Sequence, residues 1–387
     1  MIYLDNAATT YPKPEIVYST MDKFLREQCV SAGRGSYNLA RENTKLIDDT
    51  RKLLLELINS NENGKVIFTS SATIAINQVL RGLPWNDIHN VYISPFEHNA
   101  IMRTLHSLKK IYNFNLNVIP FDNLSFELDE DRLKVMFAKN NPDLLVLSHI
   151  SNVTGFILPI QRCHELANQY NPINIVDCAQ SLGIVNVDAE TEFSLCDFII
   201  FAGHKSLYGP LGIGGFIQLS NKVRLNEVIT GGTGSDSTDL DMPTEDEKRY
   251  EAGSYNIYAV AGFNIALKWI INTDINKINT KEKELTNFLI EGLKEVEGIE
   301  IYLPEDIEKH MGPVAFNIVG FLADEVGKIL DSDFNVCVRT GHHCAPYVGE
   351  FLDGQAKEGT VRVSVGYFNN LEEIKCFIAN IKEIAGD

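Results

Sequence analysis

The segment INIVDCAQSLGIVNVDAETEFSLCDFIIFAGHK, residues 173–205, contains two apolar runs that each lead to a charged side chain. The first run, 173–176, ends at Asp177, and the second, 198–201, is followed closely by Lys205. Short apolar runs rich in β-branched and aromatic residues are typical of strands that are buried on both faces. We therefore predict two successive strands that carry Asp177 and Lys205 at their carboxyl ends.

Similar runs occur on both sides of this segment. We predict further strands at 66–68, 91–93, 144–147 and 215–217, with helices at 72–81, 99–112 and 160–169 between them. Strands that alternate with helices indicate an α/β fold with a mainly parallel sheet covered on both faces. Ligands of such sheets bind in the loops that follow the carboxyl ends of the strands.

The remainder of the chain has a different pattern. Residues 231–250 are polar and lack a core period, and a loop of that length is often functional. The later elements are expected as helices at 257–271, 282–296 and 371–384 and as strands at 314–318, 336–339 and 360–365. This order of helices and strands predicts a separate α+β domain.

Composition excludes several classes of protein. The 387 residues include 34 Lys and Arg against 52 Asp and Glu, a net charge of −18, which argues against nucleic acid or an anionic membrane as partner. We find neither a membrane-spanning stretch nor a signal peptide, and expect a cytoplasmic protein. The seven cysteines include no C-x-x-C pair, so we expect free thiols and no bound metal.

Lys205 and Asp177 together favour a pyridoxal phosphate site. Lys205 follows Gly203-His204 and comes shortly before Gly209-Pro210, a setting that suits a desolvated Schiff-base lysine, although an exposed lysine in a turn fits as well. Asp177 could hold the pyridine nitrogen of the cofactor protonated, or it could cap the next helix. Their occurrence on successive strands, 28 positions apart, favours the cofactor.

Three other loops carry weaker signals. Residues 69–73, Thr-Ser-Ser-Ala-Thr, precede a predicted helix, where they could bind an anion or form an ordinary N-cap. His98 follows a predicted strand, where it could stack on the cofactor ring and move protons or be merely structural. Asn152 also follows a strand, and a turn is the simpler reason for an asparagine there.

The strongest local signal is Arg339-Thr-Gly-His-His-Cys344-Ala-Pro. Cationic and polar neighbours in a Gly- and Pro-containing loop are typical of a reactive cysteine. A metal site on His342, His343 and Cys344 is an alternative, but adjacent side chains ligate one ion poorly; an inert buried Cys344 is another. Arg362, in the alternating segment that follows, suits a clamp for a substrate carboxylate or a surface salt bridge.

In this order, the motifs resemble the cysteine desulfurases of the class V aminotransferase group, which are fold-type I pyridoxal phosphate enzymes. The sub-group with R-x-G-H-H-C-A around its cysteine is the most similar. The resemblance covers nearly the whole chain and rests on these motifs: 4–10 LDNAATT, 97–99 EHN, 151–155 SNVTG, 177–181 DCAQS, 203–205 GHK, 231–234 GGTG, 251–253 EAG and 339–345 RTGHHCA.

The resemblance implies a fold and a set of residue roles. The fold is a large cofactor-binding domain, expected over 15–255, with a mainly parallel seven-stranded sheet, and a smaller α+β domain from 1–14 and 256–387 that carries the cysteine loop. The implied catalytic residues are Cys344, Lys205 and His98. The implied cofactor contacts are Ala72, Thr73, His98, Asn152, Asp177, Gln180, His204 and Lys205, with Ser235 or Ser237 reaching the phosphate of a partner subunit. The implied substrate contacts are Arg362, Arg339 and Asn6.

The implied reaction converts L-cysteine to L-alanine in a homodimer and leaves the sulfur on Cys344 as a persulfide for an acceptor protein, which would use it for iron–sulfur clusters or modified nucleosides. Selenocysteine lyase, cysteine-sulfinate desulfinase or another class V activity is the alternative. Three residues depart from the family pattern: Tyr37, Ala202 and Tyr255 stand where His, Ser or Thr, and Pro are usual.

Overall fold

The computed structural model describes residues 1–33, 35–60, 64–234 and 238–386. Its largest sheet has seven strands in the order β2-β8-β7-β6-β5-β3-β4. These strands are β2 (Lys65–Thr69), β3 (Asn90–Ile93), β4 (Asn115–Val118), β5 (Leu144–Ser148), β6 (Ile173–Asp177), β7 (Phe198–Ala202) and β8 (Gly214–Gln218). β8 runs opposite to the other six strands, so the predicted, mainly parallel α/β sheet is confirmed.

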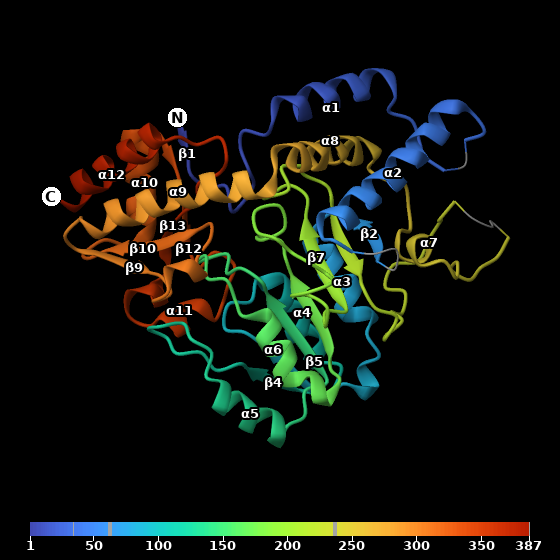
Figure 1. The fold of residues 1–387 in the computed structure, drawn as a ribbon, viewed down its shortest axis with the longest axis horizontal. Helices are drawn as coiled ribbons and strands as arrows, with labels where there is room; N and C mark the ends of the chain where they lie inside the picture. The colour runs from blue at the N-terminus through green and yellow to red at the C-terminus, as the bar shows by residue number, and fades with distance from the viewer. Residues whose placement is uncertain (34, 61–63, 235–237, 387) are drawn as a thin grey trace.

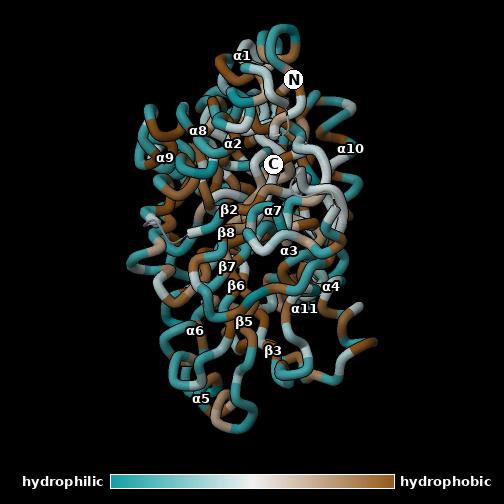
Figure 2. The backbone as a smooth tube through the Cα atoms, turned by 90° about the vertical axis from the view of Figure 1, so that its right-hand side faces the viewer, coloured by the Kyte–Doolittle hydropathy of each residue, from teal (hydrophilic) through white to brown (hydrophobic). Residues whose placement is uncertain are grey.

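Helices cover both faces of this sheet, as Figure 1 shows. Alternate side chains of one strand enter different cores: Leu144 and Val146 pack with α3 and α4, whereas Leu145 and Leu147 face the opposite layer. The helices of this part are α1 (Glu15–Glu27), α2 (Asn38–Leu57), α3 (Ala72–Gly82), α4 (Asn99–Lys109), α5 (Glu130–Lys139), α6 (Ile160–Ala167), α7 (Asp246–Tyr250) and α8 (Ile257–Thr273). The apolar interior that results is the brown centre of Figure 2.

A smaller antiparallel sheet, with the strand order β12-β13-β10-β9, forms the second part of the molecule. Its strands are β9 (Ile299–Tyr302), β10 (Val314–Ile318), β12 (Arg339–Gly341) and β13 (Thr360–Val363). Three helices, α9 (Ile275–Lys294), α10 (Ala323–Phe334) and α12 (Leu371–Ala385), share one core with it. The short helix α11 (Val348–Leu352) follows β12 in the chain. The N-terminal strand β1 (Ile2–Tyr3) joins this part by pairing with β11 (Val336–Cys337).

Several predicted boundaries are wrong. The single strand expected at 336–339 is two strands, because β11 pairs with β1 whereas β12 pairs with β13. Helix α9 begins at Ile275 rather than at 282, since Asp274 ends α8 and caps α9. The edge strands β4 and β9 were missed, because their half-exposed side chains give no continuous apolar run. The polar segment 231–250 ends in the short helix α7.

Within the described part of the chain, no helix combines the length and the apolar character that a membrane crossing requires.

Candidate active site

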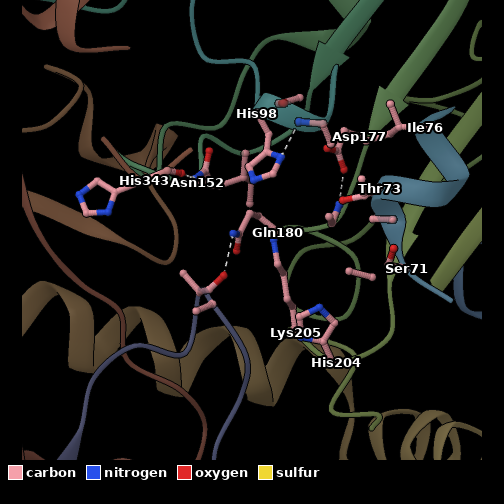
Figure 3. A pocket seen from close by; sticks show the side chains of 18 of the residues that line it. Ser71, Thr73, Ile76, His98, Asn152, Asp177, Gln180, His204, Lys205 and His343 are labelled. Carbon is pink, nitrogen blue, oxygen red and sulfur yellow. Dashed lines mark hydrogen bonds between the residues drawn. The ribbon is translucent and has the colours of Figure 1, made fainter. Parts of the chain in front are cut away.

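A cavity of about 210 Å³ lies at the carboxyl ends of the parallel strands, and most of the predicted site residues line it. Asp177 is the last residue of β6, Lys205 follows β7, and His98 and Asn152 follow β3 and β5. Figure 3 shows these side chains converging from separate loops. The sheet topology therefore brings together residues that are far apart in the sequence.

Asp177 is a buried carboxylate at the floor of the cavity. It is 7% exposed, and its Oδ1 accepts a hydrogen bond from the backbone N–H of Ala179 at 2.9 Å. Burial raises the pKa of this carboxyl group, while the Ala179 hydrogen bond and the Lys205 charge oppose that rise. A buried acid near a lysine can hold a cationic ring N–H of a ligand.

Lys205 is half-buried, and its side chain points into the cavity toward Gln180 (Figure 3). Burial lowers its pKa to about 8; Asp177 acts in the opposite direction, and the charges of Arg362 and Arg339 add to the lowering. A lysine with this pKa is partly neutral near physiological pH, as a nucleophilic amine must be. The N-terminal segment holds its backbone, since Thr10 Oγ1 donates to the carbonyl of Lys205 at 3.1 Å.

His98 has a defined tautomer because it caps α4. The backbone N–H of Ala100 donates to Nδ1 of His98 at 3.0 Å, so the ring proton of the neutral form is on Nε2. Burial, followed by the charges of Lys205 and nearby arginines, lowers the pKa of His98 to about 3. The ring is therefore a neutral group that presents an N–H.

Glu97, which the sequence analysis missed, holds the turn that carries His98. Its carboxylate is 1% exposed and accepts from Ser94 Oγ at 2.6 Å, from Ser148 N at 2.9 Å and from Ser148 Oγ at 2.7 Å. This carboxylate ties the loop after β3 to the end of β5, next to Asp177. The available signal was the acidic residue directly before His98, inside the motif 97–99.

The N-terminus of α3 forms the opposite end of the cavity. Ser71 caps this eleven-residue helix, and Ala72 and Thr73 line the cavity. A Cβ at Gly214 would lie 2.8 Å from the nitrogen of Ala72, so β8 approaches this turn closely. The Nδ1 of His204, which also lines the cavity, is buried with no partner among the described residues. Helix N–H groups and an unpaired imidazole fit a phosphate.

The cysteine loop of the smaller part closes one side of the cavity. Asn152 Nδ2 donates to the carbonyl of His343 at 2.6 Å, and the N–H of Asn99 donates to that of Cys344 at 2.6 Å. His343 and Cys344 adopt positive φ angles of 49° and 61°, which turn the chain at this contact. The Cys344 side chain is thereby held beside the cavity, half-buried.

Two arginines adjoin this loop. Arg339 Nη2 lies 3.3 Å from Cys344 Sγ, a charged donor beside the thiol. Arg362 is 1% exposed and donates to the carbonyl of Asn152 at 2.9 Å and to Asp5 Oδ1 at 2.7 Å. Arg339 and Arg362 both line the cavity. His343 Nε2 bonds instead to Thr360, and the described residues contain no group of three metal-ligating side chains.

The structure does not place Asn6 in this cavity. Its Nδ2 donates to the carbonyl of Ser364 and to Asn369 Oδ1, and its Oδ1 accepts from Tyr11 N. These bonds fasten the N-terminal segment, and the expected substrate contact of Asn6 stays a prediction. Gln180 lines the cavity and donates to the carbonyl of Ala7 at 3.0 Å, whereas Ser235 and Ser237 lie outside the described residues.

The three positions that depart from the family pattern lie in different places. Ala202 lines the cavity and provides no hydroxyl there. Tyr255 donates to Glu251 Oε2 at 2.5 Å, next to Arg51, beside a second cavity that includes Gly232. Tyr37 precedes α2 and is exposed.

Known proteins with similar sequences and structures belong to the family that the motifs of the chain resemble. The family model described as aminotransferase class-V matches residues 2–377. The chain belongs to the aminotransferase class-V family, in its cysteine desulfurase group.

Two curated relatives and one solved structure illustrate the match to this group of class-V proteins. A probable cysteine desulfurase of Pyrococcus abyssi is 32% identical, covering 99% of this chain and 94% of the relative. A cysteine desulfurase of Escherichia coli K12 is 29% identical, covering 99% and 93%. The apo structure of the cysteine desulfurase of Thermococcus onnurineus NA1 has a TM-score of 0.91 at 29% identity and covers 100% of this chain and 94% of its own.

Proposed function

We propose that the cavity binds pyridoxal phosphate and that the protein converts L-cysteine to L-alanine, leaving the sulfur on Cys344. The observation that carries this proposal is that Lys205, Asp177 and the Cys344 loop meet at one cavity, although they come from two parts of the fold. An aminotransferase without sulfur chemistry needs the first two residues but has no use for a cysteine held beside an arginine.

The donor set fits the cofactor. Asp177 would hold the pyridine N–H, Lys205 would bind the cofactor covalently, and His98 would lie against the ring. The turn at Ala72 and Thr73, together with His204 Nδ1, would hold the phosphate, because helix N–H groups donate to an anion and Nδ1 has no partner among the described residues. Asn152 and Gln180 complete the walls as contacts for the remaining polar groups.

When bound, pyridoxal phosphate supplies an electron sink for bonds broken at the amino acid carbon. Lys205 removes the α-proton of the substrate, since its pKa of about 8 leaves a neutral fraction at pH 7 to 8. His98 stays neutral and carries a proton on Nε2, so it can donate a hydrogen bond and help to move protons. Arg362 binds the α-carboxylate.

The Cys344 thiolate attacks the sulfur of the substrate. The new S–S bond forms as the substrate C–S bond breaks, and the electron pair of that bond stays on the substrate carbon, which then takes a proton and leaves as L-alanine. The guanidinium of Arg339, whose Nη2 is 3.3 Å from Sγ, places a charged donor beside the reacting sulfur. The persulfide sulfur then passes to the thiol of an acceptor protein.

We further propose a symmetric homodimer in a reducing compartment such as the cytoplasm. Gly232 and Gly234 line a second cavity near Arg51, not the cavity of Lys205 in the same chain. Because these loop residues do not line the cavity of their own chain, they are free to contact the site of a partner subunit. This supports the predicted role of Ser235 or Ser237 across the interface. All seven cysteines are free thiols, as a reducing compartment would keep them.

The decisive experiment measures L-alanine and sulfide released from L-cysteine by the loaded protein, with wild type compared to Cys344→Ala and Lys205→Ala. We expect stoichiometric release by wild type and a loss of several orders of magnitude in both variants. Rates on selenocysteine and cysteine sulfinate, measured side by side, test the alternative substrates. Wild-type protein that binds the cofactor but releases no alanine from L-cysteine would refute the proposal.

A further inference from the structure

Arg362 already has a carboxylate partner within the protein. Its Nη2 donates to Asp5 Oδ1 at 2.7 Å, and the two side chains are 1% and 21% exposed. A guanidinium buried without a counter-charge is costly, so this ion pair accounts for how Arg362 is tolerated inside the fold. The Asp5 charge acts to raise the pKa of Arg362 against the lowering caused by burial.

The backbone holds Asp5 in place beside Arg362. Asp5 forms a parallel bridge with Ser364, two residues after Arg362, and the N–H of Ser364 donates to the carbonyl of Leu4 at 2.8 Å. Ser364 Oγ in turn accepts from the N–H of Ala7 at 2.8 Å. The N-terminal segment thus runs along the end of β13, and the backbone pairing of Leu4 and Asp5 with Ser364 fixes the main chain from which the Asp5 carboxylate reaches Arg362.

Asp5 holds Arg362 without blocking its access to the cavity. Arg362 lines the cavity, whereas Asp5 is not among its lining residues. A guanidinium has five N–H groups, of which the bonds to Asp5 and to the Asn152 carbonyl use one each. The Nε of Arg362 is buried with no partner among the described residues. Enough N–H groups remain to donate to both oxygens of a substrate carboxylate.

The neighbouring charges make a fixed anion necessary. Arg339 lies directly opposite Arg362 in the register of β12 and β13, and like charges in that position repel. Lys205, when protonated, is a further cation close to both arginines, and their charges act to lower its pKa. Without Asp5, repulsion would push the Arg362 guanidinium out of its present orientation.

We propose that Asp5 is the positioning residue of the carboxylate clamp, which keeps Arg362 aligned so that amino acids are selected over the same amines without a carboxylate. This inference rests on the proposed function, in which Arg362 binds the α-carboxylate of the substrate. It assigns a role to the Asp of the N-terminal segment, where the sequence analysis had selected Asn6.

The test compares two ligands that differ only at the carboxylate. The dissociation constants of L-alanine and L-alaninamide are measured from the change in visible absorbance of the loaded protein. In Asp5→Ala we expect the constant for L-alanine to rise by roughly tenfold or more and that for L-alaninamide to change less than about threefold. Asp5→Asn keeps an acceptor in the same place and should give a smaller rise for L-alanine; it also serves if Asp5→Ala does not fold.

Ser364→Ala is the matched control, because it removes the Ala7 contact of the same segment and leaves the Asp5–Arg362 pair. It should discriminate between the two ligands as wild type does. Tighter binding of L-alanine by Asp5→Ala would overturn the proposal by showing that Asp5 competes with the substrate. An equal loss for both ligands would also overturn it. Wild type that shows no alanine release from L-cysteine would instead refute the proposed function itself.

Discussion

Arg339 and Arg362 are directly opposite each other on the neighbouring antiparallel strands β12 and β13, and each guanidinium contacts a different side chain. Arg339 contacts the Sγ of Cys344, and Arg362 contacts the carboxylate of Asp5. One pair of strands thus presents two cations to the cavity, the first for the sulfur and the second for the carboxylate. The predictions below separate these two tasks.

Replacing Arg339 should slow the chemistry of the thiol. In Arg339→Gln the charged donor at 3.3 Å from Cys344 Sγ is lost, and with it the cation beside the reacting sulfur. We expect alkylation of Cys344 by iodoacetamide at pH 7 to slow by roughly tenfold, and Arg339→Lys to recover part of the rate. The measurement is peptide mass spectrometry over time, and alkylation at the wild-type rate would contradict the assignment.

Cys344→Ala should separate binding from sulfur transfer. We expect the variant to bind L-cysteine, with a change in the visible spectrum, because Lys205, Asp177 and Arg362 are unaltered, but to release almost no sulfide. Arg362→Ala should show the opposite pattern: a much higher cysteine concentration for binding and a thiol that is still alkylated. Mass spectrometry after one turnover should find the persulfide on Cys344, and a persulfide on another cysteine would rule out its role.

Cofactor attachment should depend on pH through the Lys205 amine. Its pKa is lowered to about 8, and the amine must be neutral to attack a carbonyl, so the attachment rate should rise with pH and level off above about 8. In Asp177→Asn the midpoint should move lower, because the Asp177 charge raises the pKa of Lys205. Stopped-flow absorbance on cofactor-free protein measures this. A rate that keeps rising to pH 10 would show an ordinary lysine.

Glu97 should give the protein a measurable pH dependence of stability. Burial raises its pKa to about 7, so the contribution of Glu97 to the free energy of unfolding is greatest below its unfolded pKa of about 4.5 and is lost as the pH rises through 7. The glutamine of Glu97→Gln does not titrate, so the variant lacks this contribution to the pH dependence of the free energy of unfolding. The free energy of unfolding of the variant minus that of wild type should therefore be larger at pH 7.5 than at pH 5, as measured by urea unfolding. An identical difference at both pH values would contradict the assignment.

The proposed dimer predicts rescue between two inactive variants. One partner carries Lys205→Ala and the other carries Ser235→Ala with Ser237→Ala. If each site takes its loop from the partner subunit, a mixed dimer contains one intact site, and random reassortment should restore roughly a quarter of wild-type activity. Activity is measured after the two proteins are unfolded and refolded together. No recovery in a mixture shown to contain mixed dimers would place the loop in its own subunit's site.

The sequence by itself was enough for the strand–helix alternation, the mainly parallel sheet and the residues at its carboxyl edge. Continuous apolar runs require burial on both faces, and in a parallel sheet the ends of the strands must meet at one edge. Asp177, Lys205, His98 and Asn152 could therefore be assigned to one place before their distances were known, and the structure brings them together around one cavity.

The tertiary structure alone decided which neighbours these residues have. The contact of the Cys344 loop with Asn152 and Asn99, the ion pair of Arg362 with Asp5 and the bonds of Glu97 to Ser148 join segments separated by tens to hundreds of positions. Local periodicity does not predict such pairs, because they depend on how loops and the N-terminal segment meet once the two parts of the fold have formed. Asp5 and Asn6 illustrate this, because they are adjacent in the sequence but have different partners. The side chain of Asn6 donates to Ser364 and Asn369, whereas that of Asp5 pairs with Arg362.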